Sequence, residues 1–545
     1  MSKSYSSFVS TKKSVTPVSV PIYGREKEMV VNSTGAMVFD IGHWKQLERW
    51  LILGVESNTY YASQSKLVKE NATAIQKCIK EDGVRVVNKI VEISDSARAP
   101  KNEPALFGLA LCASYGDEKT KAAANAALPK VARIGTHLLI YTGYISDLRG
   151  FGRGIKKSIS NWFNQKKPEN LAYQVLKYKN RENWTVRDVL RVSHPTPATP
   201  LHNEIFKYVT KGWDSVGNDP HPEKALQIIW ASEKAKTLTK GSDVAKLVAD
   251  YGLTWEMIPT NFLNDLDVWE SLLPNTKPEA LMRNLGRLTS NGFLAPLSKN
   301  VTKAVNLLTD EKALKDARLH PLKMLVALKT YNQGHGEKGS LSWKPIPQIS
   351  AALEEGFYKS FGNIQPANKN TLLALDISSS MSWGQIVGMP LTPREAAAAM
   401  AMVFARTEPN YYFVGFSNDL IELKINHKMS LEDVIKYTSN LPFGSTNISA
   451  PFHWAADRKL KVDTFVVITD NEVNSNYYGK TGHVTEALKQ YRNKVGVPDA
   501  RLGVIATSVT NFSVADPSDN GKQMDFVGFD LNTPEILTQF SKGEL

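Results

Sequence analysis

The chain has 545 residues, which is too long for one hydrophobic core and predicts roughly two to four domains. Its apolar fraction of 42% and charged fraction of 22% are typical of a soluble globular protein, and no run approaches the ~18 apolar residues that span a bilayer. The only cysteines, Cys78 and Cys112, exclude a disulfide framework and a cysteine zinc site. Because no apolar signal-peptide core stands near the start, we expect a cytoplasmic protein with no membrane partner.

Positive charge is concentrated in one part of the chain. The formal net charge is +12, yet residues 370–545 hold 15 Lys and Arg against 19 Asp and Glu. Residues 1–369 therefore carry the excess, and residues 130–211 alone hold 15 basic against 5 acidic residues. Such a cluster is typical of proteins that bind RNA or DNA, although a solvated helical surface is the alternative.

The first two regions along the chain differ in pattern. Residues 1–30 are rich in Ser, Thr and Lys and predict an extended arm. Residues 31–365 predict many helices and little sheet, for example over 103–112, 125–132 and 321–330. Helices in this number without strands favour stacked helical pairs, an α-solenoid.

The third region, residues 366–545, alternates strand-like and helical segments. Helices are predicted over 393–405 and 485–494. The strand-like runs are 371–376, 411–416, 464–469, 501–507 and 525–529. This alternation predicts a mainly parallel, doubly wound α/β sheet.

Oxygen-bearing side chains follow two of these predicted strands. Asp376, Ser378 and Ser380 form an Asp-x-Ser-x-Ser turn after the first strand, Thr446 lies in a later turn, and Asp470 ends another strand. Ligands bind at such strand ends in open α/β sheets, and an all-oxygen donor set suits Mg²⁺ or Mn²⁺. An ordinary turn capped by serine is the alternative. The five residues resemble the metal-ion-dependent adhesion site of von Willebrand factor A domains, which implies a divalent cation and an acidic protein ligand at its open position.

Basic residues recur from residue 148 to residue 213. Several have helical spacing, so they are expected to share a face, and such clusters bind phosphates through counterion release. The candidate RNA-binding residues are Arg153, Lys156, Lys157, Lys177, Lys179, Arg181, Arg187, Arg191 and His194.

This basic segment has a family resemblance. Lys177-Tyr-Lys179, Leu190-Arg-Val-Ser-His194 and Lys207-Tyr-Val-Thr-Lys-Gly-Trp213 resemble the TROVE module of Ro autoantigen proteins, and that family also carries a C-terminal von Willebrand factor A domain. The resemblance covers nearly the whole chain from residue 31. It implies a TROVE domain at 31–365 and an A domain with the adhesion site at 366–545.

The resemblance also implies a function. The expected architecture is a ring of HEAT-like helical repeats closed by the A domain. Single-stranded ends of misfolded noncoding RNA would enter the central hole, and Y RNA would bind the outer basic surface, with Lys177 and His194 at the matching positions. Bacterial members suggest a tether, through Y RNA, to the 3′ exonuclease polynucleotide phosphorylase in RNA quality control, processing or decay.

Two other functions compete with an RNA-binding scaffold that has no catalytic residues. The first is a metal-dependent nuclease or phosphatase that uses Asp376, Asp470 and Glu472. Two-metal phosphoryl chemistry normally uses a denser carboxylate cluster than this sequence offers, so we expect no enzyme. The second is a protein-adhesion module with an incidental basic surface, and salt-dependent RNA binding would argue against it.

Overall fold

The computed structural model of the chain describes residues 16–32, 34–54, 73–216, 221–336, 340–362, 364–382, 386, 390–441, 444–471, 473 and 482–545. These residues form two compact units. One is built from residues 16–49 and 364–545, and the other from residues 50–54 and 73–362. Helix α1 (Gly42–Leu53) contributes residues to both.

The second unit is a series of helices. In chain order they are α3 (Thr73–Asp95), α4 (Glu103–Tyr115), α5 (Glu118–Val131), α6 (Gly135–Leu148), α7 (Arg153–Asn164), α8 (Pro168–Lys177), α9 (Val186–Ser193), α10 (Pro200–Lys211), α11 (Lys224–Ala235), α12 (Gly241–Tyr251), α13 (Leu266–Leu272), α14 (Pro278–Ser290), α15 (Lys299–Thr309), α16 (Glu311–Asp316), α17 (Pro321–Asn332) and α18 (Pro347–Lys359). A hairpin of β3 (Asn180–Arg181) and β4 (Trp184–Thr185) precedes α9, and single 3₁₀ turns η2 (Trp213–Ser215) and η3 (Trp255–Met257) follow α10 and α12.

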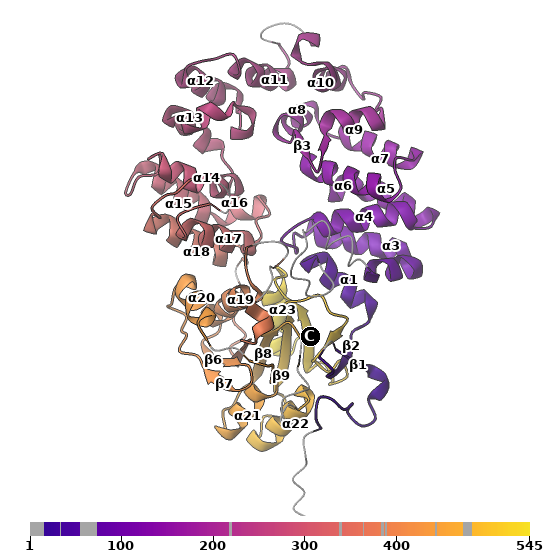
Figure 1. Ribbon diagram of the computed structural model, residues 1–545, viewed down its shortest axis with the longest axis vertical. Helices are drawn as coiled ribbons and strands as arrows, with labels where there is room; N and C mark the ends of the chain where they lie inside the picture. The colour runs from indigo at the N-terminus through magenta and orange to yellow at the C-terminus, as the bar shows by residue number, and fades with distance from the viewer. Residues whose placement is uncertain are drawn as a thin grey trace, which may run out of the picture. The chain divides into compact units, whose positions relative to one another are not determined.

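Each helix packs on its near neighbours in the series. Helix α3 packs on α4 and α5, α4 on α6, α5 on α7, and α8 on α10 and α11, as Figure 1 shows. This is the stacking of helical pairs that the sequence predicts. Two distant parts of the series also meet. Arg318 Nη1, just before α17, donates to the carbonyl oxygen of Asp95 at the end of α3 over 2.6 Å.

The other unit contains a six-stranded sheet. Its strand order is β11 (Gln523–Val527), β9 (Arg501–Ala506), β8 (Thr464–Thr469), β5 (Asn370–Asp376), β6 (Asn410–Phe416) and β7 (Leu420–Glu422). Only β7 pairs antiparallel; the other pairs are parallel. The central strands are buried on both faces, which explains their continuous apolar sequences, and the predicted doubly wound sheet is confirmed.

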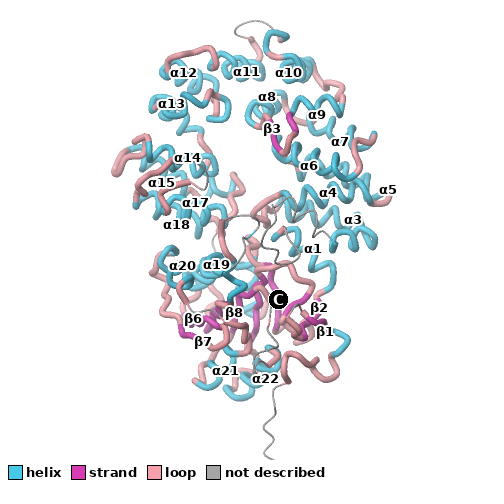
Figure 2. The backbone as a smooth tube through the Cα atoms, in the orientation of Figure 1, coloured by secondary structure: helices cyan, strands magenta, loops and turns pink. Residues whose placement is uncertain are grey.

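Helices cover both faces of this sheet. Helices α21 (Ala450–Asp457) and α22 (Val484–Val495) share one apolar core with Leu372 and Ala374 of β5. Helices α19 (Pro393–Thr407) and α23 (Thr533–Lys542) pack on the opposite face, and α20 (Leu431–Ser439) packs on α19 (Figures 1 and 2). The carboxyl ends of β5 and β8 therefore lie side by side at one edge.

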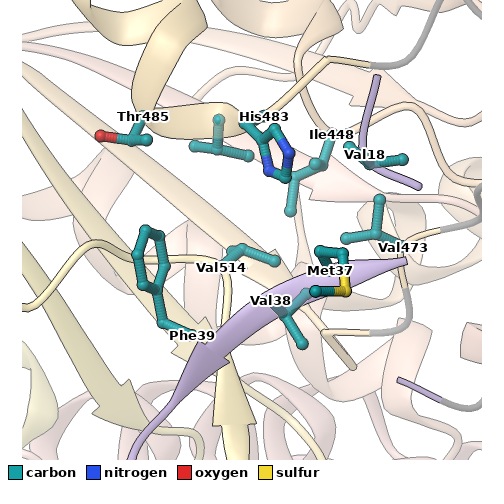
Figure 3. Close-up of a pocket in the computed structure, with 10 residues that line it drawn as sticks. Val18, Met37, Val38, Phe39, Ile448, Val473, His483, Thr485 and Val514 are labelled. Carbon is teal, nitrogen blue, oxygen red and sulfur yellow. The ribbon is translucent and has the colours of Figure 1, made fainter. Parts of the chain in front are cut away.

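A segment from the start of the chain completes this unit. Strands β1 (Met29–Val31) and β2 (Met37–Asp40) form a small antiparallel sheet with β10 (Phe512–Ser513). Figure 3 shows Val38 and Phe39 of β2, together with Val514, on one side of a pocket with mostly apolar walls, and His483 on the other side. In space, residues 16–49 thus belong with residues 364–545, whereas the sequence divides the chain at residues 30–31 and 365–366.

Candidate functional site

Helix α7 presents cations because of its amphipathic sequence. Ile155, Ile159 and Phe163 are buried, so the remaining face of the helix points outward. Arg153 and Lys157 are exposed on that face, and Lys156 is half-buried. The structure thus brings the three predicted residues of this helix to one accessible surface.

Helix α9 is fixed at both ends by local hydrogen bonds. The Thr185 hydroxyl accepts from the Asp188 amide, and the Asp188 carboxylate accepts from Thr185 in return, which forms a capping box. His194 ends the helix in the left-handed conformation, with φ of 46°. Arg187, Arg191 and His194 are all exposed, so this short rigid helix offers two cations and an imidazole to solvent.

Lys177 differs from the other predicted cations because protein groups already contact it. Its ammonium donates to the Tyr173 hydroxyl over 3.1 Å and lies 3.5 Å from a Glu256 carboxylate oxygen. It also lies 5.4 Å from the Tyr173 ring centroid and 5.7 Å from that of Tyr178. A role for Lys177 in RNA contact stays a prediction, and these contacts give it a structural role as well.

Lys179 and Arg187 line a common groove of about 550 Å³. Arg181, on β3, is exposed but does not line it. The groove also includes Lys211 and Trp213, at the end of the Lys207–Trp213 motif, and Lys236, which directly follows α11. None of these three residues is among the RNA-binding residues predicted from the sequence. The motif was the signal for the first two, whereas Lys236 is brought there only by the packing of α11.

A second set of cations lies deeper in the helical unit. Burial lowers the pKa of Lys101, and the nearby cations Lys323 and Arg181 lower it further. Burial and Arg318 likewise lower the pKa of Arg133. No sequence motif marks these residues. Lys101 lies in the loop before α4, and Arg133 lies in the loop between α5 and α6.

The predicted metal ligands gather at the ends of β5 and β8. Asp376 is fully buried; one carboxylate oxygen accepts from the Ser378 amide over 2.9 Å and the other from the Thr469 hydroxyl over 2.6 Å. The hydroxyls of Ser378 and Ser380 are 3.1 Å apart. Thus the Asp-x-Ser-x-Ser turn folds onto itself beside β8.

Thr446 and Asp470 belong to the same site. The Ser379 amide donates to the Gly444 carbonyl over 3.3 Å, which ties the loop of Thr446 to the serine turn. Asp470 follows β8 directly and is buried. Glu472, the candidate base of the nuclease alternative, lies outside the described residues.

Electrostatics favour a cation at this site. Burial and the neighbouring charge of Asp470 raise the pKa of Asp376 to about 7. Two adjacent buried carboxylates repel one another, and a divalent cation between them would relieve that repulsion. The donors are all oxygens, so the residues present fit Mg²⁺ or Mn²⁺.

Arg394 supports the same turn through hydrogen bonds, a role that no sequence motif predicts. Its guanidinium donates to the carbonyls of Ile377 and Ser378 over 2.5 and 3.0 Å, and to Thr438 of α20 over 3.4 Å. Arg394 is buried at the start of α19, so it fixes the serine turn to two helices.

These features define a class: a helical array with a basic face, joined to a doubly wound domain with clustered oxygen donors at its strand ends. The family model of the TROVE domain matches residues 30–330, and that of the Ro60 vWA domain matches residues 370–541. The chain belongs to the Ro60 family, as its motifs predict.

Known relatives cover nearly the whole chain. A protein of Deinococcus radiodurans named RNA-binding protein RO60 is 36% identical over 98% of this chain and 99% of its own length. A protein of the same name from Caenorhabditis elegans is 32% identical over 95% of this chain and 90% of its own. The crystal structure of the Deinococcus radiodurans RO (RSR) protein matches with a TM-score of 0.68 over 92% of this chain and 100% of that one.

Proposed function

We propose that this chain is the RNA-binding scaffold of a Ro ribonucleoprotein. The observation that carries the proposal is the accessible basic face of α7 and α9, where Arg153, Lys157, Arg187 and Arg191 point to solvent. Short helices with buried apolar sides hold these cations in place, and none of the four forms a salt bridge with a described carboxylate. Such a surface gains free energy when phosphates displace counterions.

Two kinds of RNA fit different parts of the helical unit. The exposed cations of α7 and α9 and the exposed His194 support binding of a structured RNA such as Y RNA. The deeper cations Lys101 and Arg133 are partly desolvated, so they would bind a narrower ligand, such as the single-stranded end of a noncoding RNA. The chain would act in RNA quality control, processing or decay in the cytoplasm. Its partner, polynucleotide phosphorylase or another 3′ exonuclease, would cleave the bound RNA.

The α/β unit then has a binding role and no catalytic one. Asp376, Ser378, Ser380, Thr446 and Asp470 would hold Mg²⁺ or Mn²⁺, and the cation would supply a coordination position for an acidic side chain of a protein ligand. Two carboxylates among neutral hydroxyls leave such an ion with residual positive charge. Among the described residues, no helix is both long and apolar enough to cross a bilayer.

The experiment compares two charge-matched double variants. Arg187→Gln with Arg191→Gln removes two cations from the basic face, and Lys312→Gln with Lys315→Gln removes two exposed cations of α16. The first should weaken binding of a structured RNA and lower the salt slope of log affinity by about 2, whereas the control should not. Equal behaviour of the two variants would contradict the proposal.

A further inference from the structure

The turn that follows Asp470 is held by the N-terminal segment of the chain, residues 16–32 and 34–37. Asn32, which lies between β1 and β2, donates from its side-chain amide to the Val473 carbonyl over 2.9 Å. The Thr34 hydroxyl donates to the same carbonyl. Two parts of the chain that are 441 residues apart in sequence therefore meet directly after a predicted metal ligand.

The same segment also contacts the chain at the start of α22. The backbone of Pro17 pairs with that of Gly482 in an antiparallel bridge. The amide and the hydroxyl of Thr16 each donate to the Glu486 carboxylate over 3.0 Å. The N-terminal segment thus holds the chain both at Val473 and again from Gly482 onward.

A path of hydrogen bonds joins the Val473 contact to the predicted metal ligands. The Val473 amide donates to the Asn471 carbonyl over 3.1 Å, and the Asn471 amide donates to the Thr469 hydroxyl over 3.2 Å. The Thr469 hydroxyl in turn donates to the Asp376 carboxylate over 2.6 Å. Asn471 has φ of 66°, so the chain turns sharply after Asp470. A shift of Val473 would therefore displace the turn on which both carboxylates depend.

The turn needs such outside contacts because its own asparagine does not fix it. The Asn471 side chain is buried, and neither of its polar atoms has a hydrogen-bond partner among the residues that the structure describes. From the sheet, the Ser508 hydroxyl donates to the Asp470 carbonyl over 2.6 Å. The turn therefore takes one support from the sheet and another from Asn32 and Thr34.

We infer that the N-terminal segment positions the metal site, with Asn32 and Thr34 as positioning residues that act on Asp470 through Val473. Groups that orient metal ligands from outside commonly change metal affinity by about 10- to 100-fold. The inference rests on the proposed binding of Mg²⁺ or Mn²⁺ and adds that this binding depends on a segment distant in sequence. Because linkage is reciprocal, a bound cation should also hold the N-terminal segment more firmly.

The first experiment changes one of the two donors. Thr34→Val removes the hydroxyl that reaches Val473 and keeps the shape of the side chain. Calorimetric titration of the full chain with Mn²⁺ should give a dissociation constant roughly ten-fold higher, with binding of a structured RNA unchanged. Thr34→Ser, which restores the hydroxyl, should return the dissociation constant to the wild-type value. Arg25→Ala is the matched control, because Arg25 ties the same segment to Asp516 instead of Val473, so it should lower stability without changing Mn²⁺ affinity.

A second measurement uses only the wild-type chain, so it does not depend on the folding of a variant. The Ala36 amide donates to the Asn32 side chain over 2.8 Å, and the Met37 amide donates to the Val18 carbonyl over 2.6 Å. Hydrogen exchange at these two amides should slow when Mn²⁺ is added, whereas exchange in α23 of the same unit should not.

Two results would overturn the inference and leave the metal site standing. One is a folded Thr34→Val variant that binds Mn²⁺ as tightly as the wild type. The other is exchange at Ala36 and Met37 that does not slow in Mn²⁺, or that slows equally in α23. A wild-type chain that binds neither Mg²⁺ nor Mn²⁺ would remove the metal site and the inference together.

Discussion

At the scale of single residues, burial fixes protonation states that the sequence alone does not reveal. His137 is half-buried in the helical unit, and the Asn102 side-chain amide is 3.3 Å from its Nδ1. Burial, with Arg133 and Lys323 nearby, lowers the pKa of His137 to about 3. The imidazole is therefore neutral in the folded chain. The sequence alone does not indicate this, because Asn102 and Lys323 come from distant segments and only Arg133 is close to His137 in the chain.

We expect the helical unit to lose stability as the pH falls below about 6.5. The unfolded chain binds a proton at His137 near that pH and the folded chain does not, so the loss continues toward pH 3 at about 1.4 kcal/mol per pH unit. His137→Gln should remove this part of the dependence in urea unfolding at pH 7.5 and 5.0. His335→Gln, at an exposed position of the same unit, is the control, and identical losses in both variants would exclude His137 as the cause.

The charge of Asp376 should be required for metal binding in the α/β unit. Asp376→Asn removes the charge that opposes Asp470 and keeps a side chain of the same shape. In the wild type, Mg²⁺ or Mn²⁺ at 100 times its dissociation constant should stabilise the α/β unit by about 2.7 kcal/mol. The variant should show no metal stabilisation in thermal unfolding and should bind RNA as the wild type does. Loss of RNA binding in a folded variant would instead place RNA at the metal site.

At the scale of elements, some strands can be predicted from the local sequence pattern, whereas others form only by pairing with distant segments. Strands β5, β6, β8, β9 and β11 follow the predicted runs closely, because each is a buried apolar segment between polar turns. Strand β7 and the β3–β4 hairpin are not among the predicted strands, nor are β1, β2 and β10. These are short, and β2 pairs with β10 through Asp40 and Phe512, so only the folded chain reveals them.

The segment before β1 should contribute measurably to the stability of the α/β unit. Arg25 donates to both carboxylate oxygens of Asp516, over 2.9 and 2.8 Å. Burial raises the pKa of Asp516, but hydrogen bonds from Arg25 and Ser518 outweigh it and lower the pKa to about 2. This contribution is therefore present above pH 3.8 and lost as the pH falls toward 2.

Arg25→Ala should cost about 2 kcal/mol at pH 7, because it leaves a buried carboxylate with one charged partner fewer. Lys27→Ala, at an exposed neighbour, should cost almost nothing. Urea unfolding of the two variants makes the comparison. An Arg25→Ala variant with the same free energy of unfolding as the wild type would mean that residues 16–31 do not stabilise the α/β unit.

At the scale of the whole molecule, most of the candidate sites could be predicted from short motifs. The metal donors stand at strand ends, so finding the strands placed Asp376 and Asp470 side by side. The basic face followed from helical spacing, as in Arg187 and Arg191. Two features required tertiary contacts: the pairing of Lys177 with Glu256 from η3, and the arrival of Lys236 beside Lys179.

The central claim is that phosphates bind to a preformed cationic surface, and a salt titration tests it most directly. Affinity of the purified chain for a structured RNA is measured from 50 to 200 mM monovalent salt. If six or more phosphates are neutralised, affinity should fall by about 10³-fold or more across that range, with log affinity linear in log salt. An affinity that stays constant over the same range would contradict the RNA-binding account.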